Sequence, residues 1–261
     1  MKKKCEGKIL SVQELACDIF DMWIETSIAK DAKSGQFIGV FPKNQATLLP
    51  RPISICEVDK EKSALRLVYR IAGKGTKEFS SYKEGDIVEV LGVLGNGYPL
   101  EEAEGKNILL LGGGIGIPPI VQLAKELRTK YPDASVTAAV GYRNDALFLK
   151  EELEKYADVL IATEDGSVGT KGNVMDAIGA AGICPDIIFS CGPMPMLRAI
   201  KKYAEEKDIP AYISLEERMA CGVGACLGCV CKTTKKDHHS HVNNARICTD
   251  GPVFEAKEVD I

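Results

Sequence analysis

Four cysteines near the carboxyl end of the chain have the residue type and spacing of metal ligands. Three of them follow the pattern Cys221-x4-Cys226-x2-Cys229, and the fourth, Cys248, comes after a longer loop. This is the ligand order of a plant-type [2Fe-2S] site, in which all four ligands are thiolates. Three glycines lie between the first three cysteines. Glycine adopts positive φ without steric cost, so backbone N–H groups can approach sulfur. We therefore predict that Cys221, Cys226, Cys229 and Cys248 hold a [2Fe-2S] cluster.

Two other uses of these thiols stay open at this point. Structural zinc also takes four thiolates, but its sites usually show two short pairs of ligands, and Cys248 has no near partner in the sequence. The nearby His238, His239 and His241 lack zinc-finger spacing and are predicted to lie in a solvated loop. Disulfides would need an oxidising compartment, which nothing else in the chain indicates. Cys231 is predicted to be a spare thiol beside the cluster, with a role as substitute ligand left open.

The composition limits the classes of function. The 261 residues are 45% hydrophobic, which is enough for about two packed domains. The net charge is −4 with both signs interspersed, so we expect no nucleic-acid partner. No apolar run reaches the length of a membrane span, and the polar residues after Met1 do not form a signal peptide. We expect a cytoplasmic protein without membrane association, in which ten cysteines indicate metal or redox chemistry.

Residues 1–98 show short β-type runs separated by turn residues, which predicts an antiparallel barrel. The expected strands are 8–12, 19–26, 37–41, 53–58, 64–71 and 87–91. Residues 99–212 instead alternate apolar strands with amphipathic helices, which predicts a parallel sheet covered on both faces. Its expected strands are 107–111, 135–141, 159–163 and 187–190, and its expected helices are 118–130, 146–156, 173–180 and 195–207.

The barrel region holds three local features that could bind an anion. Arg51-Pro52-Ile53-Ser54 enters a strand, Val68-Tyr69-Arg70 ends another, and Gly75-Thr76 begins a helical run. A glycine and a threonine at a helix start present N–H groups without acceptors, and arginine has the fork geometry that suits phosphate. Taken singly, each feature is more often an ordinary strand entry or helix cap.

The parallel-sheet region has glycine turns where strands end. Gly113, Gly114 and Gly116 follow the first strand and open a helix, the context that a phosphate-cradling loop needs. The full dinucleotide fingerprint is absent, since Ile117 stands where a third glycine would be. Cys191-Gly192-Pro193 follows the last strand of this series. Ligands of open parallel sheets bind beyond the carboxyl ends of strands, so both turns are candidate nucleotide contacts.

In this order, the barrel motifs resemble the flavin-binding barrel of the ferredoxin reductase superfamily. The resemblance implies that Arg51 holds the FAD pyrophosphate and that Ser54 lies near the reactive edge of the flavin. Pro52 and Ile53 complete that motif, with Ile53 in place of an aromatic residue that many reductases have there. Val68, Tyr69 and Arg70 would line the ring or the ribityl chain, and Gly75 and Thr76 would give N–H groups to the diphosphate.

The parallel-sheet region resembles the pyridine-nucleotide half of the same superfamily. The resemblance implies that the turn of Gly113, Gly114 and Gly116 contacts the nucleotide and that Cys191, Gly192 and Pro193 border the nicotinamide. Arg143, at the end of the second strand, could accept a 2′-phosphate, but no further basic residue lies nearby in the sequence. We therefore expect NAD rather than NADP.

The full order of parts resembles the electron-transfer subunit of type B dihydroorotate dehydrogenase. It implies an FAD-binding barrel (1–98), an NAD-binding α/β domain (99–212) and a [2Fe-2S] domain (213–261). The implied partner is an FMN-containing catalytic subunit that oxidises dihydroorotate in pyrimidine biosynthesis, in a heterotetramer of two of each chain. Electrons would pass from that FMN through the cluster and FAD to NAD, so we predict no catalytic side chain.

Two alternatives are kept, one an enzyme with the same cofactors and one a non-enzymatic module. One is the small subunit of a ferredoxin:NADP reductase, a family similar to this chain in which an aspartate replaces one cluster cysteine. The other is a zinc- or redox-sensing binding module built on a reductase scaffold.

Overall fold

The computed structural model describes residues 3–44, 46–236 and 241–261, which form two compact units. The first unit comprises residues up to 97 together with 216–230 and 246–252, and the second comprises 98–215, 231–245 and 253–261. The cysteine-rich segment is thus divided: 216–230 and 246–252 belong to the first unit, and 231–245 belongs to the second. The three-domain division expected from the sequence stays a prediction. His238 and His239 lie outside the described residues.

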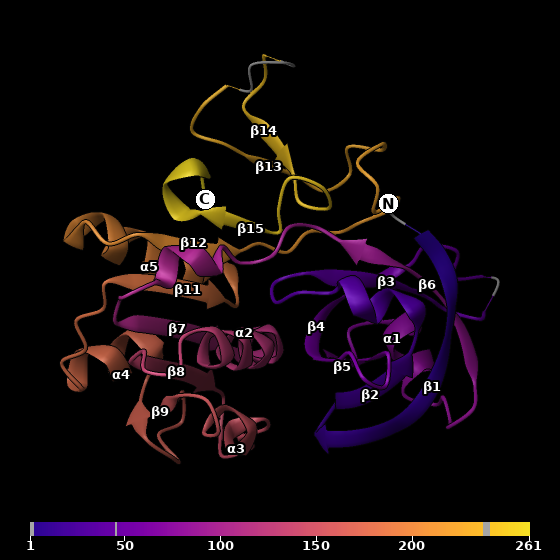
Figure 1. Ribbon diagram of the computed structural model, residues 1–261, viewed down its shortest axis with the longest axis horizontal. Helices are drawn as coiled ribbons and strands as arrows, with labels where there is room; N and C mark the ends of the chain where they lie inside the picture. The colour runs from indigo at the N-terminus through magenta and orange to yellow at the C-terminus, as the bar shows by residue number, and fades with distance from the viewer. Residues whose placement is uncertain (1–2, 45, 237–240) are drawn as a thin grey trace. The chain divides into compact units, whose positions relative to one another are not determined.

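The first unit is built on a closed antiparallel barrel, which confirms the predicted fold of this region (Figure 1). Its order around the barrel is β1-β2-β5-β4-β3-β6. The strands are β1 (Lys3–Ala16), β2 (Ile19–Glu25), β3 (Phe37–Phe41), β4 (Arg51–Asp59), β5 (Ala64–Arg70) and β6 (Ile87–Leu94). A short 3-10 helix η1 (Ser27–Asp31) follows β2, and α1 (Lys74–Phe79) follows β5. Alternate side chains such as Met22, Leu65 and Leu67 are fully buried and form the core.

Strand β1 is much longer than the predicted strand at 8–12. Residues 3–8 pair with β6, and the rest pairs with β2, with the register shifting between Ile9 and Ser11. The first residues of β1 are mostly charged, so the pattern of apolar residues did not predict them as part of a strand. Lys4 is half exposed and forms an ion pair with Glu89 of β6 at 2.9 Å, so this part of β1 carries a solvated face.

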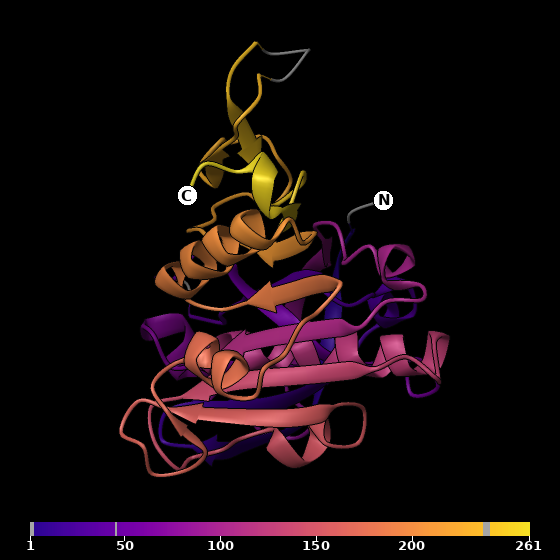
Figure 2. The same ribbon diagram turned by 90° about the vertical axis from the view of Figure 1, so that its left-hand side faces the viewer.

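The second unit is built on a seven-stranded sheet of order β10-β9-β8-β7-β11-β12-β15. All neighbouring strands are parallel except β15, which is antiparallel to β12. Figure 1 shows α2 and α3 on one face of the sheet and α4 and α5 on the other, and Figure 2 views the sheet from the side of α4 and α5. The strands are β7 (Ile108–Gly113), β8 (Val136–Tyr142), β9 (Asp158–Thr163), β10 (Thr170–Lys171), β11 (Ile187–Cys191), β12 (Ala211–Ser214) and β15 (Val253–Glu255). The helices are α2 (Ile117–Lys130), α3 (Lys150–Leu153), α4 (Val174–Ala180), α5 (Met194–Lys207) and the 3-10 turns η2 (Leu100–Ala103), η3 (Gly114–Gly116) and η4 (Ala256–Glu258).

Two details of this unit differ from the sequence prediction. The helix expected at 146–156 is only α3, because Leu149 before it has a left-handed φ of 63° and residues 146–147 have no regular secondary structure. The two-residue edge strand β10 was not predicted, and neither were β12 and β15. Both are short, and their pairing joins segments far apart in the chain, so local periodicity does not reveal it.

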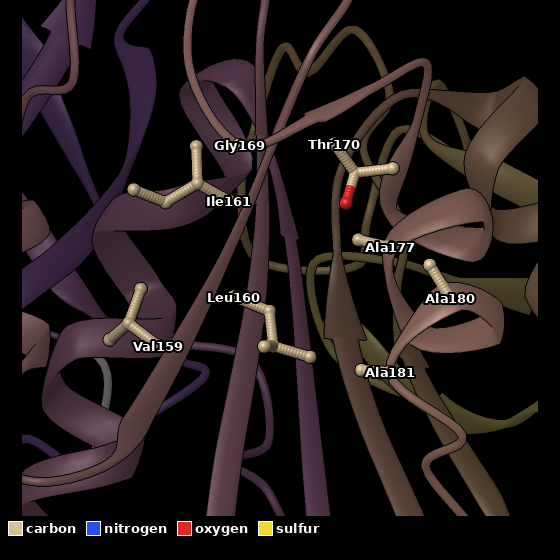
Figure 3. A pocket seen from close by; sticks show the side chains of 8 residues that line it. All are labelled: Val159, Leu160, Ile161, Gly169, Thr170, Ala177, Ala180 and Ala181. Atoms are coloured by element: carbon tan, nitrogen blue, oxygen red, sulfur yellow. The ribbon is translucent and has the colours of Figure 1, made fainter.

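A shallow apolar groove of about 440 Å³ lies between β9 and α4 (Figure 3). Val159, Leu160 and Ile161 line one side, and alanines of α4 line the other. The hydroxyl of Thr170 is the polar side-chain group shown there. The groove has no titratable lining residue and therefore no acid–base chemistry of its own.

The remaining strands are β13 (Val230–Lys232) and β14 (Asn244–Arg246), which form a two-stranded sheet. Among the described residues, no helix is both long and apolar enough to cross a bilayer.

Candidate functional site

The structure brings together the predicted diphosphate ligands of the barrel. Arg51 opens β4, while Gly75 and Thr76 belong to the first turn of α1. A Cβ atom placed on Gly75 would lie 2.6 Å from Nε of Arg51, so the arginine side chain packs directly on this turn. Amides in a first helical turn have no acceptor within the helix. A guanidinium beside such amides suits an anion, so these residues fit the pyrophosphate of a dinucleotide.

The threonine hydroxyl has a different role from the one expected at an anion site. Thr76 Oγ1 accepts hydrogen bonds from the amides of Ala72 and Gly73, at 2.9 and 3.2 Å. The hydroxyl therefore closes the turn that precedes α1, and only the backbone N–H of Thr76 is available to a ligand.

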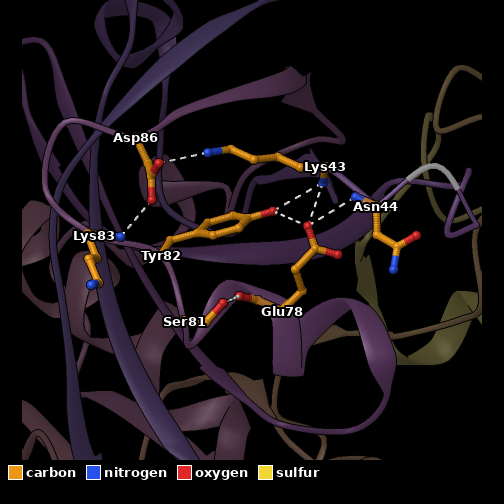
Figure 4. A network of polar contacts seen from close by, with 7 residues as sticks. All are labelled: Lys43, Asn44, Glu78, Ser81, Tyr82, Lys83 and Asp86. Carbon is orange, nitrogen blue, oxygen red and sulfur yellow. Dashed lines mark hydrogen bonds and ion pairs between the residues drawn. The ribbon is translucent and has the colours of Figure 1, made fainter.

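A polar network fixes α1 on the barrel (Figure 4). The Glu78 carboxylate accepts hydrogen bonds from the amides of Lys43 and Asn44, at 2.6 and 3.2 Å, and from the Tyr82 hydroxyl at 2.7 Å. Lys43 Nζ forms an ion pair with Asp86 at 2.8 Å. Burial raises the pKa of Tyr82 above its usual range, and the hydrogen bond to Glu78 adds to this. The network joins α1 to the loop after β3, so it holds the turn that carries Gly75 and Thr76.

The predicted flavin-lining residues fall on two faces of the barrel wall. Ile53 and Tyr69 belong to the buried core. Because side chains alternate along a strand, Pro52, Ser54, Val68 and Arg70 lie on the opposite face. No hydrogen-bond partner of the buried Tyr69 hydroxyl occurs among the described residues. An orphaned buried hydroxyl on this wall fits a polar ligand group nearby, while direct flavin contacts of Ile53 and Tyr69 stay predictions.

The first three predicted cluster ligands lie in a loop that aims backbone amides at sulfur. Sγ of Cys221 accepts N–H groups from Val223 and Cys226, and Sγ of Cys226 accepts that of Gly228, each at 3.4 Å. Gly222 and Gly224 have φ values of 66° and 83°, so the loop conformation requires glycine there. The Val223 amide, followed by that of Cys226, lowers the pKa of the Cys221 thiol to about 6. Such N–H···S contacts stabilise thiolate and fit an iron–sulfur cluster.

The last two of the four predicted ligands, Cys229 and Cys248, are buried. Cys229 is 3% exposed and Cys248 is 0% exposed. The Ile247 amide donates to the Cys229 carbonyl at 2.9 Å, which places the segments of these two cysteines side by side. In the described part of the chain, no three His, Cys, Asp or Glu side chains converge as they would on a single ion. Four thiolates shared by the two irons of a [2Fe-2S] cluster need not converge on one point.

The predicted nucleotide contacts meet at a topological switch point. From β7 the chain adds β8, β9 and β10 on one side of that strand, and α4 then returns it to β11 on the other side, so the connections reverse between β7 and β11. This is where open parallel sheets bind ligands. Gly112 of β7 pairs with Cys191 of β11. A Cβ on Gly116 would collide with the Cys191 carbonyl, and one on Gly113 would lie 2.9 Å from Pro193 Cδ, so the two turns touch.

Tyr98 is a residue of this site that the sequence analysis missed. It is 6% exposed, and its hydroxyl donates to the Ser190 carbonyl at 3.0 Å, one residue before Cys191. Its ring packs edge-on against Phe189 with centroids 5.7 Å apart. Burial raises the pKa of Tyr98 well above its usual range, and the nearby Cys191 thiol adds to this. Tyr98 therefore stays neutral and fixes the end of β11. A lone aromatic residue after a glycine turn gave no signal of that role.

Solved structures share this architecture. One is a crystal structure of a ferredoxin NADP+ reductase from Neisseria gonorrhoeae with bound FAD and NADP, at 19% identity and a TM-score of 0.65 over 83% of this chain and 94% of that one. A second belongs to an NADH-dependent reduced ferredoxin-NADP oxidoreductase, at 31% identity and a TM-score of 0.84 over 97% of this chain and 89% of that one. Fold and site together define a ferredoxin reductase-like electron-transfer protein.

Sequence comparisons give the particular family. Residues 216–260 match the model of the iron-sulfur cluster binding domain of dihydroorotate dehydrogenase B. The chain is 43% identical over 264 aligned positions to the dihydroorotate dehydrogenase B (NAD(+)) electron transfer subunit of Bacillus cereus (strain B4264), covering 99% of both chains. The chain belongs to the family of dihydroorotate dehydrogenase B electron transfer subunits, which confirms the resemblance found in the sequence.

Proposed function

We propose that this chain takes electrons from an FMN-containing dihydroorotate-oxidising partner at its four-cysteine segment and delivers them to NAD at its parallel sheet. The observation that carries the proposal is the match over 99% of the chain to electron transfer subunits of the NAD-dependent enzyme. The N–H···S contacts of the loop at 221–228 support the cluster independently of that match.

The barrel residues would hold FAD without taking part in bond chemistry. Arg51 and the amides of Gly75 and Thr76 would bind its pyrophosphate, while Ser54, Val68 and Arg70 would flank the flavin on the outer face of the wall. When bound, FAD exchanges single electrons with an iron–sulfur cluster and a hydride with a nicotinamide. The chain therefore needs no general base, and its residues supply position and charge.

The switch-point turns would hold the nicotinamide nucleotide. Gly113, Gly114 and Gly116 permit a close approach of the backbone, and Cys191, Gly192 and Pro193 would border the nicotinamide. Arg143 follows β8 in the place where a 2′-phosphate would be recognised. No second arginine or lysine adjoins it in sequence, so we propose NAD as the nucleotide.

The partner would dock where the cluster loop exposes apolar side chains. Val223, Leu227 and Val230 are 43%, 62% and 37% exposed, although they lie between or beside cysteine ligands. Exposed apolar groups clustered within one loop mark an interaction surface. A partner seated there would bring its FMN close to Cys221 and Cys226. We propose a heterotetramer with two copies of each chain.

Co-expression with the FMN-containing, dihydroorotate-oxidising chain tests this function. The purified complex should contain iron, sulfide, FAD and FMN, and it should reduce NAD when dihydroorotate is added. Cys226→Ser should lose the cluster and this turnover but keep FAD. The matched control is Cys184→Ser, which replaces an exposed thiol outside the cluster loop. Wild-type turnover in Cys226→Ser, or zinc in place of iron and no flavin in the wild-type complex, would refute the proposal.

A second function is favoured by one observation, the 31% identity and TM-score of 0.84 with the reduced ferredoxin-NADP oxidoreductase. In that case the chain would exchange electrons with ferredoxin and NADP. The same complex, assayed with reduced ferredoxin and NADP in place of dihydroorotate and NAD, would distinguish the two.

A further inference from the structure

The turn after β6 forms hydrogen bonds with the backbone that directly follows Cys248. Asn96 follows β6, and its amide donates to the Gly251 carbonyl at 2.7 Å. Its side-chain Nδ2 donates to the carbonyls of Thr249 and Asp250, at 3.2 and 3.0 Å. One residue thus binds three consecutive carbonyls downstream of Cys248.

The same stretch is closed on its other side by an ion pair. The Arg246 guanidinium donates to both Asp250 carboxylate oxygens, each at 3.0 Å. The Arg246 carbonyl accepts the amides of Thr249 and Asp250, at 3.1 and 2.7 Å. This folds residues 246–250 into a tight turn with Cys248 buried inside it.

This turn also touches the loop that carries the first cysteines. Nη1 of Arg246 donates to the Gly224 carbonyl at 3.4 Å. A Cβ on Gly224 would lie 2.8 Å from Cγ2 of Thr249, so the two segments pack without room for a side chain. The turn that contains Cys248 therefore packs directly on the loop that carries Cys221 and Cys226.

We propose that Asn96 is a positioning residue for Cys248 and hence for the [2Fe-2S] cluster. The proposal rests on the proposed function, because it takes the four cysteines as cluster ligands. Asn96 touches no sulfur and acts through the three carbonyls that it holds. The barrel that would bind FAD thus helps to position Cys248, the fourth predicted ligand, through the turn after β6 that carries Asn96.

Two variants of Asn96 test this role. Asn96→Ala removes the two side-chain hydrogen bonds but keeps the backbone bond to Gly251. Asn96→Asp is isosteric and sets a carboxylate against the carbonyls of Thr249 and Asp250, so it should have the larger effect. Asn144→Ala is the control, because Asn144 is exposed and its side chain accepts one bond from the Ala146 amide.

The readouts on the anaerobically purified complex are the EPR spectrum of the reduced cluster and the rate at which a chelator bleaches its absorbance. Loss of an outer hydrogen bond typically weakens metal binding about 10-fold or more. We expect Asn96→Asp to bleach about 10-fold faster with a shifted EPR spectrum, Asn96→Ala to be intermediate, and both to keep wild-type FAD content.

The possible outcomes test the positioning role of Asn96 and the proposed function separately. Wild-type EPR spectra and bleaching rates in both variants would overturn the positioning role while leaving the proposed function intact. A loss of FAD that parallels the loss of iron would also overturn it, since it would show that Asn96 only stabilises the barrel. Absence of iron and sulfide from the wild-type complex would instead overturn the proposed function.

Discussion

The Ile247 amide donates to the Cys229 carbonyl at 2.9 Å, and this bond joins the segments of the two buried cysteines. Cys229 ends the first cysteine loop and Cys248 follows Ile247, so this backbone bond brings the segments of two predicted ligands together. The more exposed pair, half-buried Cys221 and exposed Cys226, lies instead in a glycine-rich loop. The predicted site thus has a buried half that is fixed by pairing and an exposed half that is shaped by glycine.

A side chain at position 75 should weaken FAD binding. In Gly75→Ala, the new Cβ would meet Nε of Arg51 at 2.6 Å, so the guanidinium must move away from the α1 amides. We expect FAD affinity to fall by about 10-fold or more, as for loss of a charge-assisted contact worth about 1.5–3 kcal/mol. Flavin fluorescence during dilution measures this. Gly73→Ala is the matched control, because nothing lies within 4 Å of its Cβ position, and equal FAD loss in both variants would contradict the role of Arg51.

Removal of the Glu78 carboxylate should loosen the same helix. Glu78→Ala deletes three hydrogen bonds, two from backbone amides and one from Tyr82. At about 1 kcal/mol for each bond, the free energy of unfolding should fall by about 2–3 kcal/mol. Urea denaturation of the barrel, monitored by flavin release, measures the loss. Glu61→Ala, at an exposed residue in the β4–β5 turn, should leave the midpoint unchanged.

The phenol of Tyr82 should contribute to loss of stability at alkaline pH. Burial raises the folded-state pKa above the unfolded value of about 10, and Glu78 adds to this. The neutral phenol therefore stabilises the fold fully below about pH 10, and this share is lost as pH rises through the folded pKa. Tyr82→Phe should lose less stability than wild type between about pH 9 and 11 in urea titrations. An identical pH dependence in the two proteins would show that folding does not raise the pKa of Tyr82.

A methyl group at position 116 should damage nucleotide binding alone. The added Cβ would collide with the Cys191 carbonyl and force the switch-point turns apart. In Gly116→Ala, we expect a KM for NAD raised at least about 10-fold, with FAD and iron contents unchanged. Gly179→Ala in α4 serves as the control, since its Cβ position is open and alanine favours the helix. Loss of FAD in Gly116→Ala would mean that the turn has a different role.

Local patterns in the sequence predicted the elements better than their long-range partners. Cysteine spacing gave the candidate ligands, and periodicity gave the barrel and the parallel sheet, because both signals lie within short windows. The roles of Asn96 and Tyr98 depend on carbonyls far along the chain, at 249–251 and 190, so composition around them carried no information. The pairing of β12 with β15 was missed for the same reason.

That pairing has a consequence for how the cysteine-bearing segment is anchored. Ser214 lies directly across from Val253, so the chain departs from the sheet and rejoins it at a single place. Residues 215–252 are therefore an insertion between two paired strands, β12 and β15. The pairing of β12 with β15 thus holds both ends of this segment by backbone hydrogen bonds of the sheet itself, at one fixed place.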